Sequence, residues 1–323
     1  MKLSAVVLNR NDDYKEPKRA AFCVNSLLDT FDEVVYVDYN SPDDKGSSLN
    51  TFIDDIPKTG KLKHIVIPPY AHNLMTNITG GDDVQVCTEV VGKNIGIRRA
   101  TGDWIVSTNI DIIGPERNTF RELVPTLSNN NFYIVSRRDV DLQKCMSYDV
   151  KDWKQLHKEL CEITRERHMC GAKLRGVKPL DDCPNVREKG DGRCWGGGTC
   201  EYEVKYPWGC TPNDVWSKIN CCGDWQFAHR DIWYNIRAYE EFMMGKCFTD
   251  TNIQKKAEIY GYPVEVIYDL PLFHIEHKPS AGTGGGKGGT ENNPLMWVDQ
   301  FNQQSLNQTT WGFSQIAFEE EII

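Results

Sequence analysis

The polar residues best placed to do chemistry in this chain come directly after short apolar runs. Asn109 and Asp111 follow the run Trp104–Thr108, and Asp38 follows the run Val34–Val37. In open α/β sheets, ligands bind beyond the carboxyl ends of the strands, where these three side chains would lie. Hard divalent cations prefer oxygen ligands, so Asp111 is a candidate for holding one. The pattern therefore predicts a cation-binding site at this edge of a sheet.

Apolar runs rich in β-branched residues predict strands, and in the first part of the chain they alternate with helical patterns. From Pro17 to Leu28, apolar residues recur at steps of three and four, as in an amphipathic helix. Strands are expected at Leu3–Leu8, Val34–Val37, His64–Ile67, Trp104–Thr108 and Phe132–Ser136, and further helices at Leu49–Ile56 and Cys87–Arg99. This alternation predicts an α/β fold with a mostly parallel, Rossmann-like sheet flanked by helices.

The regular pattern breaks after residue 140 and returns near Gly223. Eight of the 12 cysteines lie between Cys161 and Cys222, so we expect a cysteine-rich insertion there. The chain has no C-x-x-C pair, which argues against a zinc site. Without a secretory signal, reduced thiols are the default, and disulfides and zinc stay open.

Helical and strand patterns then resume. Asp250 heads an expected helix at Thr251–Ile259, because an aspartate at the N-cap accepts hydrogen bonds from free backbone donors. Further strands are expected at Val264–Tyr268 and Phe273–His277. Irregular structure is expected at Tyr70–Asp83, in the glycine-rich stretch Pro279–Pro294, and in the solvated tail Leu295–Ile323.

The charge of the chain excludes one class of partner. The formal net charge of the 323 residues is −9, whereas phosphate neutralisation needs a basic surface, so no nucleic-acid partner is expected. No run approaches the roughly 20 apolar residues of a membrane-spanning helix, and the first residues lack a signal-peptide core. We therefore expect a soluble, cytoplasmic protein without a membrane span.

Several motifs in order resemble those of glycosyltransferases with the GT-A fold, most closely family two and its relatives. Lys93–Gly96, Ala100–Asp103 and Asn109–Asp111 resemble the Asn-x-Gly, Ala-x-Gly-Asp and Asp-x-Asp motifs of that family. Val37–Ser41 is similar to its hydrophobic-Asp-x-x-Ser motif, and Gly261-Tyr262 with the His-containing strand is similar to its closing section. The resemblance covers residues 2–136 and 223–278. Asn109 replaces the first aspartate of the metal motif, and an amide binds a cation more weakly than a carboxylate.

The resemblance implies a metal-dependent transfer of a sugar, with inversion, from a nucleotide-diphosphate sugar to an acceptor hydroxyl. The donor is expected to be UDP-linked, and the acceptor a glycan or a protein- or lipid-linked group. Asp111 would bind Mn²⁺ or Mg²⁺, with His277, or alternatively His274, completing the metal site. Donor contacts are expected from Asp38, Asn94, Arg98, Asn109 and Asp111.

An inverting transfer also needs a base within about 3 Å of the acceptor hydroxyl. The resemblance assigns this role to Asp250, with Glu241 as the alternative, and places Asp224 and Trp225 in the acceptor site. On this basis, residues 1–140 form a nucleotide-sugar-binding half and 221–278 an acceptor and catalytic half. Residues 141–220 form the cysteine-rich insertion, and 279–323 the glycine-rich loop and tail.

Other interpretations remain open at this stage. Asp38 can instead cap a turn, Asp250 can be only a helix N-cap, and Arg98 can lie on a solvated helix face. A nucleotidyltransferase would need a glycine-rich loop after the first strand, and Asn9–Asp12 has no glycine. A non-catalytic interaction protein on a degenerate GT-A domain stays open because of Asn109.

Overall fold

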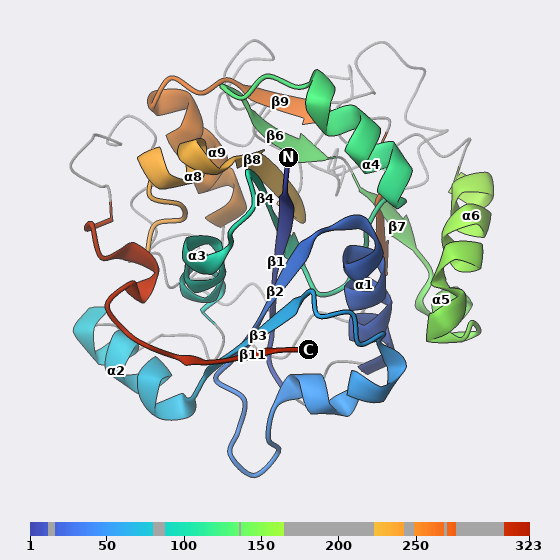
Figure 1. Cartoon of the computed structure of the whole chain (residues 1–323), viewed down its shortest axis with the longest axis horizontal. Helices are drawn as coiled ribbons and strands as arrows, with labels where there is room; N and C mark the ends of the chain where they lie inside the picture. The colour runs from blue at the N-terminus through green and yellow to red at the C-terminus, as the bar shows by residue number, and fades with distance from the viewer. Residues whose placement is uncertain are drawn as a thin grey trace, which may run out of the picture.

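The computed structural model of the chain describes residues 1–11, 17–79, 88–135, 137–164, 223–241, 249–267, 270–275 and 307–323. A central sheet has eight strands in the order β11-β3-β2-β1-β4-β8-β6-β9, with helices on both faces (Figure 1). Its strands are β1 (Leu3–Asn9), β2 (Glu33–Tyr39), β3 (Leu62–Ile67), β4 (Trp104–Asn109), β6 (Phe132–Val135), β8 (Trp225–His229), β9 (Val264–Ile267) and β11 (Glu319–Ile322).

Most strands of this sheet are parallel, as predicted. Strands β3, β2, β1 and β4 run in one direction, and β6 pairs in parallel with β9. Strand β8 is antiparallel to both β4 and β6, and β11 is antiparallel to β3. Because β8 lies between β4 and β6, the predicted donor half and acceptor half share one sheet.

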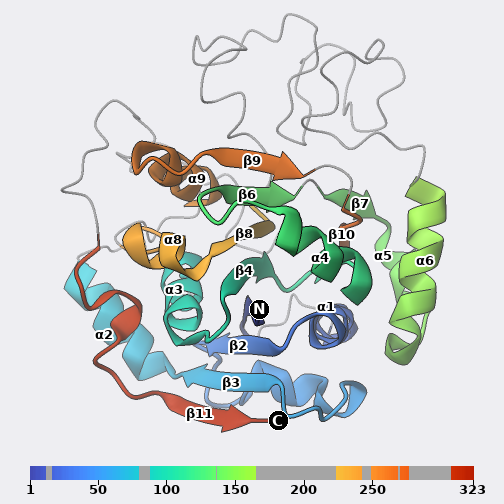
Figure 2. The same ribbon diagram turned by 45° about the horizontal axis from the view of Figure 1, so that its top comes forward.

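Side chains alternate between the two faces along each strand. Both faces of this sheet are apolar, and helices cover each of them. In β1, Ala5 and Val7 belong to one hydrophobic core and Val6 and Leu8 to the other. The layers are visible edge-on in Figure 2. The first face carries α1 (Pro17–Thr30), α4 (Arg117–Leu123), α5 (Leu142–Met146) and α6 (Trp153–Thr164). The second carries α2 (Pro69–Thr79), α3 (Glu89–Arg99), α8 (Arg230–Asn235) and α9 (Thr249–Ile259).

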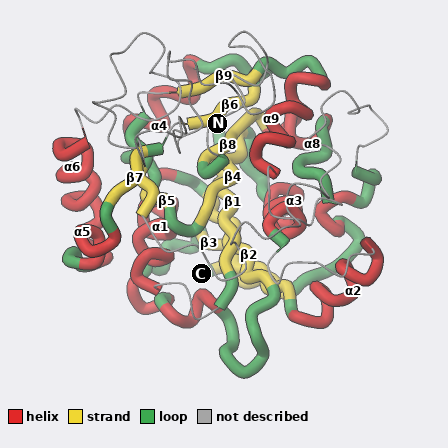
Figure 3. The backbone as a smooth tube through the Cα atoms, turned by 180° about the vertical axis from the view of Figure 1, so that it is seen from behind, coloured by secondary structure: helices red, strands yellow, loops and turns green. Residues whose placement is uncertain are grey.

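A second, small sheet has the order β5-β10-β7 and lies near α1 and α5 (Figure 3). Its strands are β5 (Ile112–Ile113), β7 (Arg138–Val140) and β10 (Phe273–Ile275). Strand β10 is antiparallel to β5 and parallel to β7, with His274 opposite Asp139. This sheet therefore brings residues next to the end of β4 together with β10, more than 150 residues later in the chain.

Three segments differ from the sequence-based expectation. The helix expected at Leu49–Ile56 is two 3-10 helices, Ser48–Thr51 and Ile53–Asp55, because Phe52 between them is non-helical (φ −147°, ψ 12°). The expected loop from Tyr70 is largely α2, which buries Ala71 and Met75, one turn apart, against the sheet. The expected solvated tail includes β11, an exposed edge strand.

The predicted insertion begins within the first core. Residues 141–164 form α5, α6 and the 3-10 helix Val150–Asp152, and Cys145, Val150, Trp153 and Leu156 are buried with α1. Most of the cysteine-rich insertion and the whole glycine-rich stretch lie outside the described residues. Cys23, Cys145 and Cys161 are free thiols. Within the described ranges, no helix is long and apolar enough to cross a membrane.

Candidate active site

Asn109 ends β4, and its carboxamide joins a lysine to an aspartate. Its Oδ1 accepts a hydrogen bond from Lys93 Nζ at 2.8 Å, and its Nδ2 donates to Asp224 Oδ1 at 2.6 Å. Lys93 Nζ also lies 2.5 Å from Glu89 Oε1, one turn earlier on α3. Although burial opposes the ammonium charge, Glu89 holds the pKa of Lys93 above its usual value. A positive charge is therefore built in beside the end of β4.

Lys93, Asn109 and Asp224 form a polar network, and ion pairs extend it from the start of β8 to the small sheet. Asp224, just before β8, accepts a hydrogen bond through Oδ2 from Arg137 Nη1. Arg137 Nε lies 3.0 Å from Asp139 Oδ1 on β7. Burial would raise the pKa of Asp139, but the hydrogen bond from His274 and the charge of Arg137 lower it. Asp139 is thus a carboxylate held between two cationic side chains.

His274 lies between two aspartates. Its Nδ1 is 2.8 Å from Asp139 Oδ1, and its Nε2 is 3.7 Å from Asp111 Oδ2. The two strands set this arrangement, because His274 is opposite Asp139 in register and the Ile275 backbone N–H donates to the Asp111 carbonyl at 2.9 Å. Burial alone would lower the pKa of His274, but Asp111 and Asp139 raise it to about 9.

Asp111 and His274 form an ion pair, and its spacing is one that two ligands of a single cation would also have. Its 3.7 Å exceeds the roughly 2.7–3.2 Å of an N–H···O hydrogen bond. Two ligands that each lie about 2.1 Å from a cation are about 3.0 Å apart at a right angle and about 4.2 Å apart when opposite. A histidine that binds metal through one nitrogen usually donates the other N–H to a carboxylate, as Nδ1 does here to Asp139.

Asp111 and His274 would supply only two ligands of such a site. In the part of the chain that the structure describes, no group of three or more His, Cys, Asp or Glu side chains is arranged to hold a metal ion. His277, the first choice from the sequence, lies outside the described residues.

Asp38 is at the carboxyl end of β2, but its carboxylate bonds to its own loop. Its Oδ1 accepts from Ser41 Oγ at 2.5 Å and from Ser48 Oγ at 2.8 Å, and its Oδ2 accepts from the Ser48 backbone N–H at 3.1 Å. The residue is 1% exposed. These are the bonds of a turn-capping aspartate, and contact with a nucleotide base would require some of them to break.

Asn94 and Glu241 connect α3 to the C-terminal segment. Asn94 is fully buried and exchanges hydrogen bonds with the backbone of Tyr239 at 2.7 and 2.9 Å. Glu241 Oε1 accepts from Asn94 Nδ2 at 3.2 Å and from the Gly312 backbone N–H at 2.7 Å. Burial raises the pKa of Glu241 above its usual value. Both side chains thus make internal bonds, which weakens the case for Glu241 as the base.

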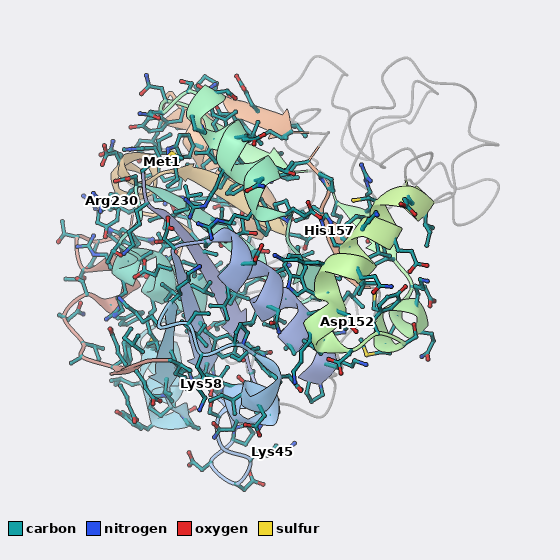
Figure 4. All side chains as sticks on the ribbon, turned by 45° about the vertical axis from the view of Figure 1, so that its right-hand side comes forward. Met1, Lys45, Lys58, Asp152, His157 and Arg230 are labelled. Carbon is teal, nitrogen blue, oxygen red and sulfur yellow. The ribbon has the colours of Figure 1, made fainter. Side chains whose placement is uncertain are left out.

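Arg98 lies at the opposite edge of the sheet from Asn109. Its guanidinium is 5.0 Å from the ring centroid of Tyr234 and 4.8 Å from that of Trp311. Helix α3 runs against the direction of β4, so Lys93, earlier on the helix, reaches the carboxyl ends of the strands and Arg98, at its last turn, does not. Figure 4 labels Met1 and Arg230 on the upper left side of the molecule and Lys45, in the loop after β2, at its bottom.

Trp225 offers no surface to a sugar, which corrects the expectation for it. Its side chain is 0% exposed and packs in the core, with ring centroids 5.8 Å from Phe31 and 5.9 Å from Phe120. Side chains alternate along β8, so Trp225 points into the core of the first face while Asp224, one residue earlier, joins the polar network.

Asp250 lies in the first turn of α9, near this network. Its Oδ2 accepts a hydrogen bond from the Gly223 backbone N–H at 3.1 Å, and its carbonyl accepts from Gln226 Nε2 at 2.9 Å. Gly223 and Gln226 flank Asp224 and Trp225 in sequence, so the start of α9 is held close to Asp224.

Sequence reasoning did not assign Lys93, Arg137 or Asp139 to the site. Lys93 stands at the head of the Lys93–Gly96 motif, and the other two follow the strand β6. Their position after or beside strands is the same signal that indicated Asp38 and Asp111. This sequence signal does not reveal that β7 pairs with β10, and that pairing brings Asp139 to His274.

No protein-family model matches the chain, and no curated protein matches it. Solved structures do resemble it. The mannosyltransferase PcManGT from Pyrobaculum calidifontis, in complex with GDP-Man and Mn²⁺, is 13% identical with a TM-score of 0.45, over 87% of this chain and 58% of that one. Residues 1–349 of S. aureus TarS are 14% identical with a TM-score of 0.43, over 85% and 60% of the two chains.

A longer S. aureus TarS structure is 13% identical with a TM-score of 0.44, over 85% of this chain and 37% of that one. The chain spans less than two thirds of the length of each of these three chains.

Proposed function

We propose that this chain is a metal-dependent glycosyltransferase that moves a sugar from a nucleotide-diphosphate sugar to an acceptor hydroxyl. The observation that carries the proposal is the arrangement of Asp139, His274 and Asp111. One carboxylate holds Nδ1 of the imidazole at 2.8 Å, and the other faces Nε2 at 3.7 Å, a spacing that suits a cation. The arrangement lies beyond the carboxyl end of β4, where α/β sheets bind ligands.

In this proposal Asp111 and His274 would hold Mn²⁺ or Mg²⁺, and Asp139 would orient the imidazole. When bound, the cation would supply positive charge against the negative charge that develops on the diphosphate leaving group. Lys93 adds a second positive charge on the other side of Asn109, 2.8 Å from its Oδ1. This ammonium would repel a cation rather than help to bind it, but it would share the neutralisation of the diphosphate.

Asp250 is the proposed general base. Its carboxylate takes the proton from the acceptor hydroxyl as the hydroxyl oxygen attacks the anomeric carbon. The bond from that carbon to the diphosphate breaks on the opposite face, so the configuration inverts. The hydrogen bond from Gly223 to Oδ2 holds the carboxylate at the start of α9, next to the strand that follows Asp224.

UDP is the donor nucleotide that we propose, and calorimetry tests it together with the metal. UDP should bind in the presence of Mn²⁺, and Asp111→Ala or His274→Ala should abolish the Mn²⁺-dependent part of that binding. Asp152→Ala is a matched control, because Asp152 is exposed and belongs to a distant 3-10 helix. Unchanged binding in both site variants would refute the metal assignment, and GDP binding in place of UDP would change the nucleotide only.

The base is tested separately with Asp250→Asn. This variant should keep its affinity for UDP and Mn²⁺ but lose sugar transfer by about 10²–10⁴-fold, the usual contribution of a general base. Full transfer activity in the variant would show that Asp250 only begins the helix. The assay measures UDP release from a set of UDP-sugars with methyl glycosides as acceptors.

A further inference from the structure

The side-chain amide of Asn109 has a fixed orientation, because its two partners differ in chemistry. Its Oδ1 accepts from Lys93 Nζ at 2.8 Å, and its Nδ2 donates to Asp224 Oδ1 at 2.6 Å. An ammonium group only donates hydrogen bonds and a carboxylate only accepts them, so an amide turned the other way would satisfy neither. The oxygen that could bind a cation therefore faces an ammonium, and this makes Asn109 a poor ligand for a metal ion.

The surrounding charges explain why an aspartate would fit badly at this position. One of its oxygens would replace Nδ2, 2.6 Å from Asp224 Oδ1, and two carboxylates this close repel each other. Lys93 is already paired with Glu89, 2.5 Å away. Arg137 is paired with both Asp224 and Asp139. Two cations thus already face three carboxylates, so a fourth carboxylate would add repulsion.

The residues that Asn109 holds adjoin the proposed base. The Asp224 carbonyl accepts from Thr108 Oγ1 at 2.7 Å, so the end of β4 holds both the backbone and the side chain of Asp224. The residue before it, Gly223, donates its backbone N–H to Asp250 Oδ2 at 3.1 Å. A methyl group on Gly223 would overlap Asp250 Cβ, so these two segments are in close contact. A shift of Asp224 would therefore be transmitted to Asp250.

We propose that Asn109 is a positioning residue and not a metal ligand, which rests on the glycosyl transfer proposed above. Its amide joins Lys93 to Asp224 and, through Gly223, keeps the carboxylate of Asp250 in place for the acceptor hydroxyl. The network requires an amide here, because the side chain must accept from a lysine on one side and donate to an aspartate on the other. The asparagine in the metal motif thus follows from its neighbours in this chain and does not indicate a lost activity.

The first test needs no substrate and exchanges the two side chains. Asn109→Asp should lower the Tm by about 2 °C or more through carboxylate repulsion, and Asp224→Asn should lower it as well. The double variant N109D/D224N should recover most of both losses, because the exchanged amide can donate to the carboxylate at position 109 and accept from Arg137. Asn50→Asp, the same change at an exposed residue, is the control and should leave the Tm unchanged. Losses that simply add in the double variant would overturn the proposal.

The second test separates positioning from metal binding. Asn109→Ala should lower the kcat of sugar transfer about tenfold or more, because small displacements of a catalytic group are costly. Its Kd for Mn²⁺, followed by electron paramagnetic resonance, should equal that of the wild type, whereas Asp111→Ala should lose Mn²⁺ binding.

The outcomes of this second test are distinct. A Kd weakened as much as in Asp111→Ala would make Asn109 a ligand, and an unchanged kcat would refute the positioning role. Either result would overturn this proposal and leave the proposed function standing. A wild type that transfers sugar from no UDP-sugar would refute the proposed function, and the Tm comparison would still decide whether the amide bridges Lys93 and Asp224.

Discussion

Replacing Asp139 with asparagine is expected to weaken Mn²⁺ binding although Asp139 is not a proposed ligand. Its Oδ1 lies 2.8 Å from His274 Nδ1, and this charged acceptor fixes the ring so that Nε2 faces Asp111. The amide of an asparagine is a weaker acceptor and can also rotate to present its NH₂ group. Losing such a partner of a metal-binding histidine typically costs about 10–100-fold in metal affinity, or about 1.4–2.7 kcal/mol.

Titration of Mn²⁺ followed by its electron paramagnetic resonance signal gives the Kd of each variant directly. Asp152→Asn, the same chemical change at an exposed residue, should leave the Kd unchanged. His274→Ala sets the upper limit, since it removes the ligand itself. If Asp139→Asn binds Mn²⁺ as tightly as the wild type while His274→Ala does not, then Asp139 does not orient the imidazole and the reasoning from the 2.8 Å contact is wrong.

Two further predictions concern stability. His157 packs against Phe273, and burial lowers its pKa to about 4. Between pH 6.5, the ordinary pKa of histidine, and pH 4, the unfolded chain binds a proton that the folded chain does not. The free energy of unfolding should therefore decrease by about 3 kcal/mol as the pH is lowered through this range. Urea unfolding of His157→Leu should show a shallower fall, and an identical pH profile would contradict this. Trp225→Ala should cost about 3–5 kcal/mol because the indole is fully buried against Phe31 and Phe120, and a loss below about 1 kcal/mol in the same assay would be inconsistent with that packing.

The sequence predicted the ends of strands β1 and β4 to within one or two residues. The sequence predicts Leu3–Leu8 and Trp104–Thr108, and the structure has Leu3–Asn9 and Trp104–Asn109. Strands covered by helices on both faces read as continuous apolar runs, so their ends are visible where the polar residues begin.

Elements that bury little of themselves were missed. Helix α2 has only a narrow buried side, so its polar residues read as a loop. Strand β11 is exposed along its length, and it is attached by backbone bonds to β3 and by the ion pair of Glu320 with Arg99. Backbone pairing of this kind leaves no pattern of side chains in the sequence.

The candidate site divides in a similar way. The positions of Asp111 and Asn109 after a buried strand predicted where they lie, and His274 was named as one of two alternatives. Trp225 and Arg98 were misplaced because aromatic and basic residue types do not reveal which face of a strand, or which end of a helix, they occupy. Lys93 illustrates the same point, since the direction of α3 alone distinguishes it from Arg98.

The sequence alone predicted the α/β class, the alternation of strands and helices in the first part of the chain, and the position of a carboxylate just after β4. These follow from local periodicity and from the abrupt change from apolar to polar residues. Only the tertiary structure decided that His274 meets Asp139, 135 residues earlier, and that Asn109 bonds to Lys93 and Asp224. Contacts of that range depend on how β7, β8 and β10 pair, and strand pairing is a property of the folded chain.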